Sequence, residues 1–189
     1  MTEKEKMLLQ EIYDANNDKE LISERQAAKS ICYEYNNLNP NEIEKRIILL
    51  KKLLGKTKEK LHIEQPFMCD YGYNIEIGDN FYANHNLLIL DANKVKFGDN
   101  VFIGPNCGFY TASHPLDYPT RNKDLEYANP IIVGNNVWFG GNVVVLPGVK
   151  IGDNTVIGAG SVVTKDIPQN SLAVGNPCHV IRKINGEEL

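Results

Sequence analysis

His114 is the side chain of this sequence best suited to act as a general base. It lies in a Ser-His-Pro tripeptide within residues 111–130, a stretch rich in aromatic, proline and charged residues. An unperturbed imidazole has a pKa of about 6.5, so at neutral pH most of it is uncharged and can accept a proton from a hydroxyl group. The other histidines, His62, His85 and His179, lie outside this stretch. A base of this kind can serve a reaction in which a hydroxyl group must lose its proton.

The transfer of an acyl group to an alcohol is one reaction of this kind. It needs hydrogen-bond donors for the oxyanion of the tetrahedral intermediate, and it needs both reactants to be held within attack distance. It requires no metal ion. The four cysteines, Cys32, Cys69, Cys107 and Cys178, are far apart and form no Cys-x-x-Cys pair. We therefore expect neither a zinc cluster nor a disulfide framework.

Residues 1–57 are expected to form a helical N-terminal segment. Residue types that favour helices dominate there, and glycine is absent until Gly55. Asp18 is expected to cap a second helix, and a third helix is expected over residues 42–54. The apolar face of this third helix would comprise Ile43, Ile47, Leu50 and Leu54.

The remainder, residues 58–189, is expected to form a second domain built from a six-residue repeat. An apolar residue recurs at Val133, Phe139, Val145, Ile151, Ile157 and Val163. Glycine often follows, and Gly or Asn in the turn permits the positive φ that most residues resist. Three units of strand and turn would make one triangular coil of about 18 residues, and stacked coils would share one core. The pattern indicates a mainly β fold, a parallel β-helix, and leaves its hand open.

The repeat is interrupted twice. Two extra residues separate Ile89 from Phe97, and Phe109 and Val133 are 24 residues apart. The second interruption is an inserted loop over residues 111–130. An excursion of this length from a compact solenoid is usually functional or disordered, and the aromatic and proline content argues against disorder. We therefore expect the loop to carry the site.

These features resemble the maltose/galactoside O-acetyltransferase family of hexapeptide acyltransferases over nearly the whole chain. The resembling segments occur in family order at 11–14, 32–36, 69–72, 81–84, 90–91, 111–115, 134–138, 158–166 and 175–177. The resemblance implies a left-handed β-helix and a homotrimer with active sites between subunits. It also implies transfer of the acetyl group of acetyl-CoA to a sugar hydroxyl by direct attack in a ternary complex, with His114 as the general base.

The same resemblance implies roles around the acceptor. Asn84 would donate its amide N–H to the oxyanion. The residues that match the acceptor pocket are Asp14, Asp70, Tyr82 and Asp91. Carboxylates suit sugar hydroxyls because each accepts several hydrogen bonds. Glu126 would either orient the His114 imidazole or contact the sugar, and Ala92 stands where some relatives carry an acidic residue.

A second set of residues matches the family's CoA site. It comprises Gly141, Ala159, Thr164, Lys165 and Arg182. The backbone N–H of Gly141 matches the group that contacts the thioester carbonyl, and the cations Lys165 and Arg182 would suit the phosphates. Trp138 would pack either at the trimer edge or along the pantetheine arm.

Other functions remain open at this stage. Acetyltransferases of the same fold act on streptogramins, chloramphenicol or serine, although the helical N-terminal segment favours a sugar. A γ-type carbonic anhydrase needs three histidine ligands on a metal, and His85 and His114 lack a third partner in the central repeats. A non-catalytic scaffold is the remaining alternative.

Composition limits the partners and the compartment. The net charge of −4 leaves no basic footprint of a nucleic-acid-binding protein. No run approaches the roughly 20 apolar residues needed to span a bilayer, and the charged start does not resemble a secretory signal. We therefore expect a cytoplasmic protein with no nucleic-acid or membrane partner.

Overall fold

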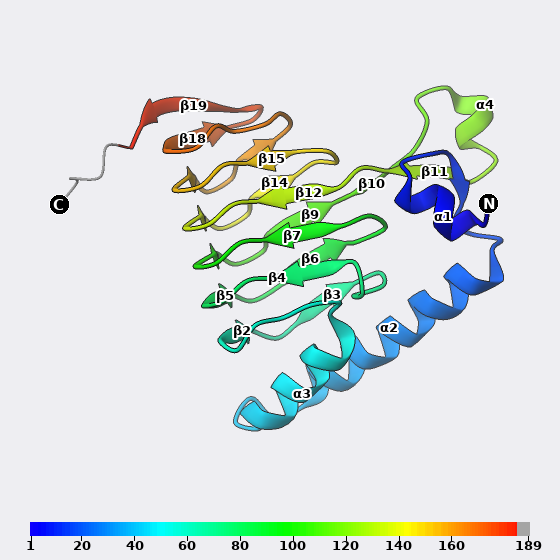
Figure 1. The fold of residues 1–189 in the computed structure, drawn as a ribbon, viewed down its shortest axis with the longest axis horizontal. Helices are drawn as coiled ribbons and strands as arrows, with labels where there is room; N and C mark the ends of the chain where they lie inside the picture. The colour runs from blue at the N-terminus through cyan, green and yellow to red at the C-terminus, as the bar shows by residue number, and fades with distance from the viewer. Residues whose placement is uncertain (185–189) are drawn as a thin grey trace.

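The computed structural model describes residues 1–184, and most of them form a triangular stack of coils (Figure 1). One side is a four-stranded sheet of β4 (Ile75–Ile77), β7 (Val95–Phe97), β12 (Ile131–Val133) and β15 (Lys150–Ile151). The second is a five-stranded sheet of β3 (Phe67–Cys69), β6 (Leu87–Leu90), β9 (Gly108–Tyr110), β14 (Val144–Val145) and β17 (Val162–Val163). The third is a seven-stranded sheet of β2 (Leu61–Ile63), β5 (Phe81–Ala83), β8 (Phe102–Ile103), β13 (Trp138–Phe139), β16 (Val156–Ile157), β18 (Ser171–Gly175) and β19 (Cys178–Lys183). The predicted parallel β-helix is confirmed.

The strand register follows the six-residue repeat. Val133 on β12 pairs with Ile151 on β15, 18 residues later, as one regular coil requires. Ile77 pairs with Phe97 after 20 residues, because two extra residues enter that coil. Phe97 pairs with Val133 after 36 residues, which is one coil plus the inserted loop. Both interruptions therefore leave the stacking of the coils intact.

Asparagine side chains form a ladder along one corner of the prism. Its members are Asn80, Asn100, Asn136, Asn154 and Asn170, with φ between 54° and 56°. Asparagine tolerates this left-handed conformation better than most residues. Each amide donates to the next one at 2.9–3.1 Å. The asparagines of the repeat thus adopt the left-handed backbone conformation of the turn. Their side chains also link each coil to the next by hydrogen bonds.

The interior of the prism is filled by the apolar residue of each repeat. The rings of Phe81, Phe97, Phe109 and Phe139 form a continuous column, with successive centroids 5.0–5.2 Å apart. All four are buried. Two of the three contacts are edge-to-face, the arrangement that aromatic quadrupoles favour. This column makes the prism a rigid support for the residues at its corners.

The two longer helices of the N-terminal segment lie at the first coils of the prism (Figure 1). It contains α1 (Glu3–Leu8), β1 (Tyr13–Asp14), α2 (Lys19–Asn37) and α3 (Ile43–Leu53). The predicted cap is confirmed, since the Asp18 carboxylate accepts a hydrogen bond from the Leu21 N–H at 2.9 Å. The predicted face of the third helix was partly wrong. Ile43 is 57 % exposed, whereas Arg46 is buried because it donates to the Ile63 carbonyl at 2.7 Å.

The inserted loop is ordered and is tied to the N-terminal segment. It contains β10 (Ala112–Ser113), α4 (Tyr118–Arg121) and β11 (Leu125–Ala128). Strand β11 pairs with β10 on one side and with β1 on the other, both antiparallel. Figure 1 shows α1, β11 and α4 gathered beside one corner of the prism. Among residues 1–184, no helix is long and apolar enough to cross a membrane.

Candidate active site

A pocket of about 390 Å³ lies where the N-terminal segment meets the inserted loop. Its polar lining includes Tyr13, Arg25, Asp70, Tyr71, His114 and Glu126. Asp70 follows β3 and the loop follows β9, so the pocket stands at the corner after the five-stranded sheet. The structure therefore brings three residues that the sequence predicted, Asp70, His114 and Glu126, into one cavity.

The imidazole of His114 is held in one orientation by a backbone carbonyl. Its Nδ1 lies 3.1 Å from the Leu125 oxygen. A carbonyl can only accept, so Nδ1 carries the proton and the neutral ring has its lone pair on Nε2. Nε2 lies 4.0 Å from Oε1 of Glu126, and the His114 side chain is half exposed. The ring thus offers a basic nitrogen on the side of the Glu126 carboxylate.

Glu126 is fixed by a residue that the sequence did not single out. Its Oε2 accepts a hydrogen bond from the hydroxyl of Tyr13 at 2.9 Å. Tyr13 is 1 % exposed, and burial together with the charge of Glu126 raises the pKa of its phenol. The phenol therefore stays protonated and remains a donor. No local signal identifies this contact, since the two residues are 113 positions apart.

Asp70 and Asp14, two other residues predicted to bind the acceptor, have carboxyl groups in different surroundings. Asp70 lines the pocket, and burial raises the pKa of its carboxyl while the charge of Arg25 opposes that rise. Asp14 lies next to Tyr13 on β1, but its carboxylate accepts hydrogen bonds from the backbone N–H groups of Asn16 and Asn17 at 3.1 and 3.0 Å. Asp14 therefore shapes the turn that follows β1.

Asp91 lies behind the wall of the pocket rather than in it. Its side chain is fully buried, and Oδ1 accepts from the backbone N–H of Asp70 at 3.0 Å and of Tyr71 at 2.9 Å. Oδ2 is buried without a hydrogen-bond partner. Burial raises the pKa of this carboxyl to about 7. The structure does not support the predicted contact with the acceptor, because Asp91 holds the turn that carries Asp70.

Asn84 and Tyr82 lie on a different part of the prism. Both belong to the chain around β5, in the seven-stranded sheet. The Tyr82 ring stacks on His62, with centroids 5.4 Å apart. The side-chain oxygen Oδ1 of Asn84 accepts from the His85 N–H at 2.7 Å, and the side-chain N–H₂ of Asn84 has no hydrogen-bond partner within residues 1–184. Asn84 thus has a free donor, at a corner other than that of His114.

Two predicted CoA residues share the corner of Asn84. Gly141 and Ala159 follow β13 and β16, and the Gly160 N–H donates to the Gly141 carbonyl at 2.9 Å. A Cβ at Gly140 would lie 2.5 Å from the backbone nitrogen of Ala159, so only glycine fits there. Thr164 and Lys165 instead follow β17 in the five-stranded sheet, and Arg182 lies on β19 opposite Leu172. The predicted CoA residues are therefore divided between corners.

The outer faces of the sheets differ in polarity. Tyr82, Phe102 and Trp138 are in register on the seven-stranded sheet, and Phe102 and Trp138 are 41 % and 55 % exposed. On the four-stranded sheet the corresponding outward residues include Glu76 and Lys96, which form an ion pair at 3.4 Å. An exposed aromatic stripe is typical of a surface that another chain covers.

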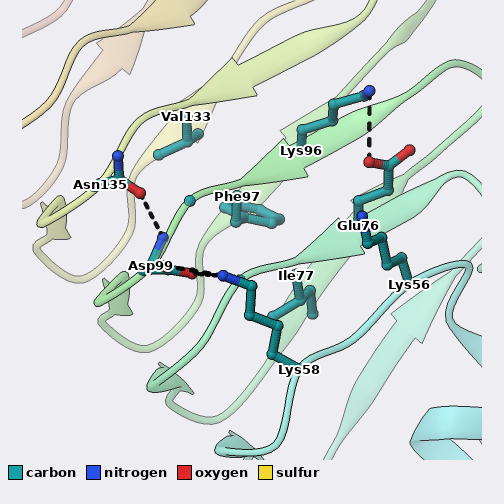
Figure 2. Close-up of a pocket in the computed structure, with 11 residues that line it drawn as sticks. Lys56, Lys58, Glu76, Ile77, Lys96, Phe97, Asp99, Val133 and Asn135 are labelled. Atoms are coloured by element: carbon teal, nitrogen blue, oxygen red, sulfur yellow. Dashed lines mark hydrogen bonds and ion pairs between the residues drawn. The ribbon is translucent and has the colours of Figure 1, made fainter.

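A second hollow, of about 320 Å³, lies over the corner after the four-stranded sheet. Figure 2 shows the Lys58 side chain directed at Asp99 and Lys96 directed at Glu76. The ion pair of Lys58 and Asp99 is 2.8 Å long. This hollow contains no histidine and most of its charges pair with one another. It is therefore not the candidate active site.

Comparison with known proteins decides the family. Residues 6–58 match the maltose acetyltransferase hexapeptide capping motif, and residues 130–165 match the bacterial transferase hexapeptide family of six repeats. The crystal structure of a maltose O-acetyltransferase from Clostridium difficile 630 is 52 % identical, with a TM-score of 0.96 and 98 % of each chain covered. The chain belongs to the maltose/galactoside O-acetyltransferase family. Its predicted left-handed β-helix is thereby confirmed.

Two further relatives extend the comparison. The galactoside O-acetyltransferase of Escherichia coli K12 is 49 % identical over 168 residues, which is 89 % of this chain and 83 % of that protein. A hexapeptide-repeat acetyltransferase of Vibrio cholerae, solved in complex with acetyl coenzyme A, is 37 % identical with a TM-score of 0.88, covering 98 % of this chain and 100 % of the other. The protein described by the present sequence is therefore an acetyltransferase, and acetyl-CoA is its co-substrate.

Proposed function

We propose that the enzyme transfers the acetyl group of acetyl-CoA to a hydroxyl group of a sugar, such as maltose, glucose or a galactoside. The observation that carries this proposal is the orientation of the His114 imidazole at the pocket. Its Nδ1 is bound to the Leu125 carbonyl at 3.1 Å, which leaves a basic Nε2 at a pocket that also holds carboxylates. This is the arrangement that deprotonation of an alcohol requires.

The reaction proceeds by direct attack in a ternary complex. Nε2 of His114 accepts the hydroxyl proton as the acceptor oxygen attacks the thioester carbonyl carbon. The resulting tetrahedral intermediate carries an oxyanion, which the free amide N–H₂ of Asn84 and the backbone N–H of Gly141 stabilise. Collapse breaks the carbon–sulfur bond, and the imidazolium returns its proton to the departing sulfur. The products are the acetyl ester and CoA thiol.

A sugar acceptor is supported by the carboxylates of the pocket. Asp70 and Glu126 line it from opposite segments of the chain, the β3 turn and the inserted loop. Each carboxylate accepts several hydrogen bonds and so suits adjacent hydroxyl groups. The names of the relatives, maltose and galactoside O-acetyltransferase, agree with an acceptor of this class. Asp14 and Tyr82 would contribute further contacts from their own segments.

The complete site forms between subunits of a homotrimer. Asn84, Gly141 and Ala159 share one corner of the prism, whereas His114 occupies another. The two groups can meet only if a neighbouring chain presents one of them. The exposed stripe that contains Phe102 and Trp138 offers an apolar surface for that contact. CoA would lie in the groove between prisms, with its phosphates near Thr164, Lys165 and Arg182.

A thiol-release assay with acetyl-CoA tests the proposal. The acceptors are maltose, glucose, a galactoside, chloramphenicol, a streptogramin and serine. We expect release with sugars and a fall of about 100-fold to 10,000-fold in His114→Ala. His179→Ala is the matched control, because its Nδ1 also lies near a backbone carbonyl, at 3.2 Å, but outside the pocket.

The outcomes separate the alternatives. Release with serine or a drug alone would keep the mechanism and overturn the acceptor class. Full activity in His114→Ala would refute the base assignment, and absence of release with every acceptor would favour a scaffold.

A further inference from the structure

The hydroxyl of Tyr13 links the N-terminal segment to the His114 side of the active site. It donates to Oε2 of Glu126 at 2.9 Å, while Oε1 of the same carboxylate lies 4.0 Å from Nε2 of His114. We propose that Tyr13 is a positioning residue for acetyl transfer, acting through the Glu126 carboxylate on the His114 imidazole. This inference rests on the proposed role of His114 as the base.

Strand pairing sets the geometry of this link. In the pair of β1 and β11, Tyr13 lies opposite Glu126 and Asp14 lies opposite Leu125. Leu125 supplies the carbonyl that holds Nδ1 of His114, and the next residue, Glu126, supplies the carboxylate near Nε2. Two consecutive residues of β11 therefore flank the imidazole, one through its backbone and one through its side chain. Strand β1 holds both of them in place.

The hydroxyl matters because a carboxylate alone is poorly oriented. The terminal torsion of a glutamate side chain has a broad, roughly two-fold distribution. A hydrogen bond from Tyr13 to Oε2 selects one orientation and leaves Oε1 on the side of His114. A hydrogen bond to an ionised acceptor is about twice as strong as a neutral one. Burial also raises the pKa of the Tyr13 phenol, so it stays a donor at neutral pH.

The separation between Oε1 and Nε2 indicates what the carboxylate does. At 4.0 Å the two atoms do not form a hydrogen bond, so Nε2 remains free to take the proton of the acceptor. Once the proton has moved, the imidazolium carries a charge that a fixed carboxylate at this distance stabilises. The contact therefore favours the transition state over the neutral ground state, and its loss lowers kcat rather than affinity for acetyl-CoA.

The test is Tyr13→Phe, which removes only the hydroxyl. We expect kcat to fall about 10-fold with the KM for acetyl-CoA unchanged. The matched control is Tyr73→Phe. Tyr73 also ties the N-terminal segment to the prism through a glutamate, donating to Glu24 at 2.7 Å, but it does not line the pocket. It should leave kcat within about twofold, with a similar decrease in thermal stability.

A double-mutant cycle with Glu126→Ala identifies the route. If Tyr13 acts through Glu126, Tyr13→Phe has less than about a twofold effect in the Glu126→Ala background. An undiminished effect in that background, an equal loss in Tyr73→Phe, or unchanged kcat in Tyr13→Phe would overturn the proposal. His114→Ala is measured in parallel. If His114→Ala retains activity, the role of His114 as the base is refuted. If His114→Ala loses activity while Tyr13→Phe has normal activity, only the role of Tyr13 is refuted.

Discussion

Asp91→Asn is expected to remove a pH dependence of stability that arises behind the active-site pocket. The Asp91 carboxyl is fully buried, and burial raises its pKa from an ordinary value of 3.8 to about 7. The charge of Asp70 adds to the rise, and hydrogen bonding from the Tyr71 N–H opposes it. Asparagine keeps the oxygen that accepts from these backbone N–H groups but cannot ionise.

The sign and size follow from proton linkage. Between these pKa values the folded chain binds a proton at Asp91 that the unfolded chain releases, so stability falls as the pH rises. The loss begins above the unfolded pKa and is complete just above the folded one. The interval from 3.8 to about 7 corresponds to about 4 kcal/mol. The wild type should therefore lose about 4 kcal/mol relative to Asp91→Asn between pH 4 and pH 8.

Urea unfolding at fixed pH and equal protein concentration measures this difference. Asp99→Asn is the control, because the hydrogen bond from Lys58 lowers the pKa of the partly exposed Asp99 carboxyl below its ordinary value of 3.8. Its contribution to stability is lost only at lower pH, so Asp99→Asn and the wild type should keep a nearly constant difference from pH 4 to pH 8. A difference between wild type and Asp91→Asn that stays constant from pH 4 to pH 8 would refute the reasoning. Acceptor KM should change little, and a large rise would restore Asp91 as a sugar contact.

Two further predictions concern assembly and cofactors. Mixing His114→Ala and Asn84→Ala subunits should restore activity at about a quarter of the sites if each site draws these residues from neighbouring chains, and mixtures as inactive as the parents would place both in one chain. Prolonged treatment with a chelator should leave acetyl transfer unchanged, because the proposed base is an imidazole, and a loss that zinc reverses would require a metal in the mechanism.

Local sequence determined the architecture of this protein. The inward residue and the turn residue of each repeat meet requirements that act within one coil, so spacing alone paired Val133 with Ile151. The interruption after Phe109 marked the loop that carries His114, because an excursion of this length from a solenoid is usually functional or disordered. Family resemblance then supplied roles for Asn84 and the CoA residues, which spacing could not.

Tertiary structure decided which of these residues meet. Tyr13 reaches Glu126 across 113 residues, and no periodicity records such a contact. Asp91 follows a strand, as Asp70 does, yet it turns beneath the backbone of that neighbour and is buried. Asn84 and His114 both belong to the series of segments that resemble the family, but they occupy different corners of the prism. The physical reason is that residue type fixes what a side chain can do, whereas the packing of distant segments fixes where its polar atoms point.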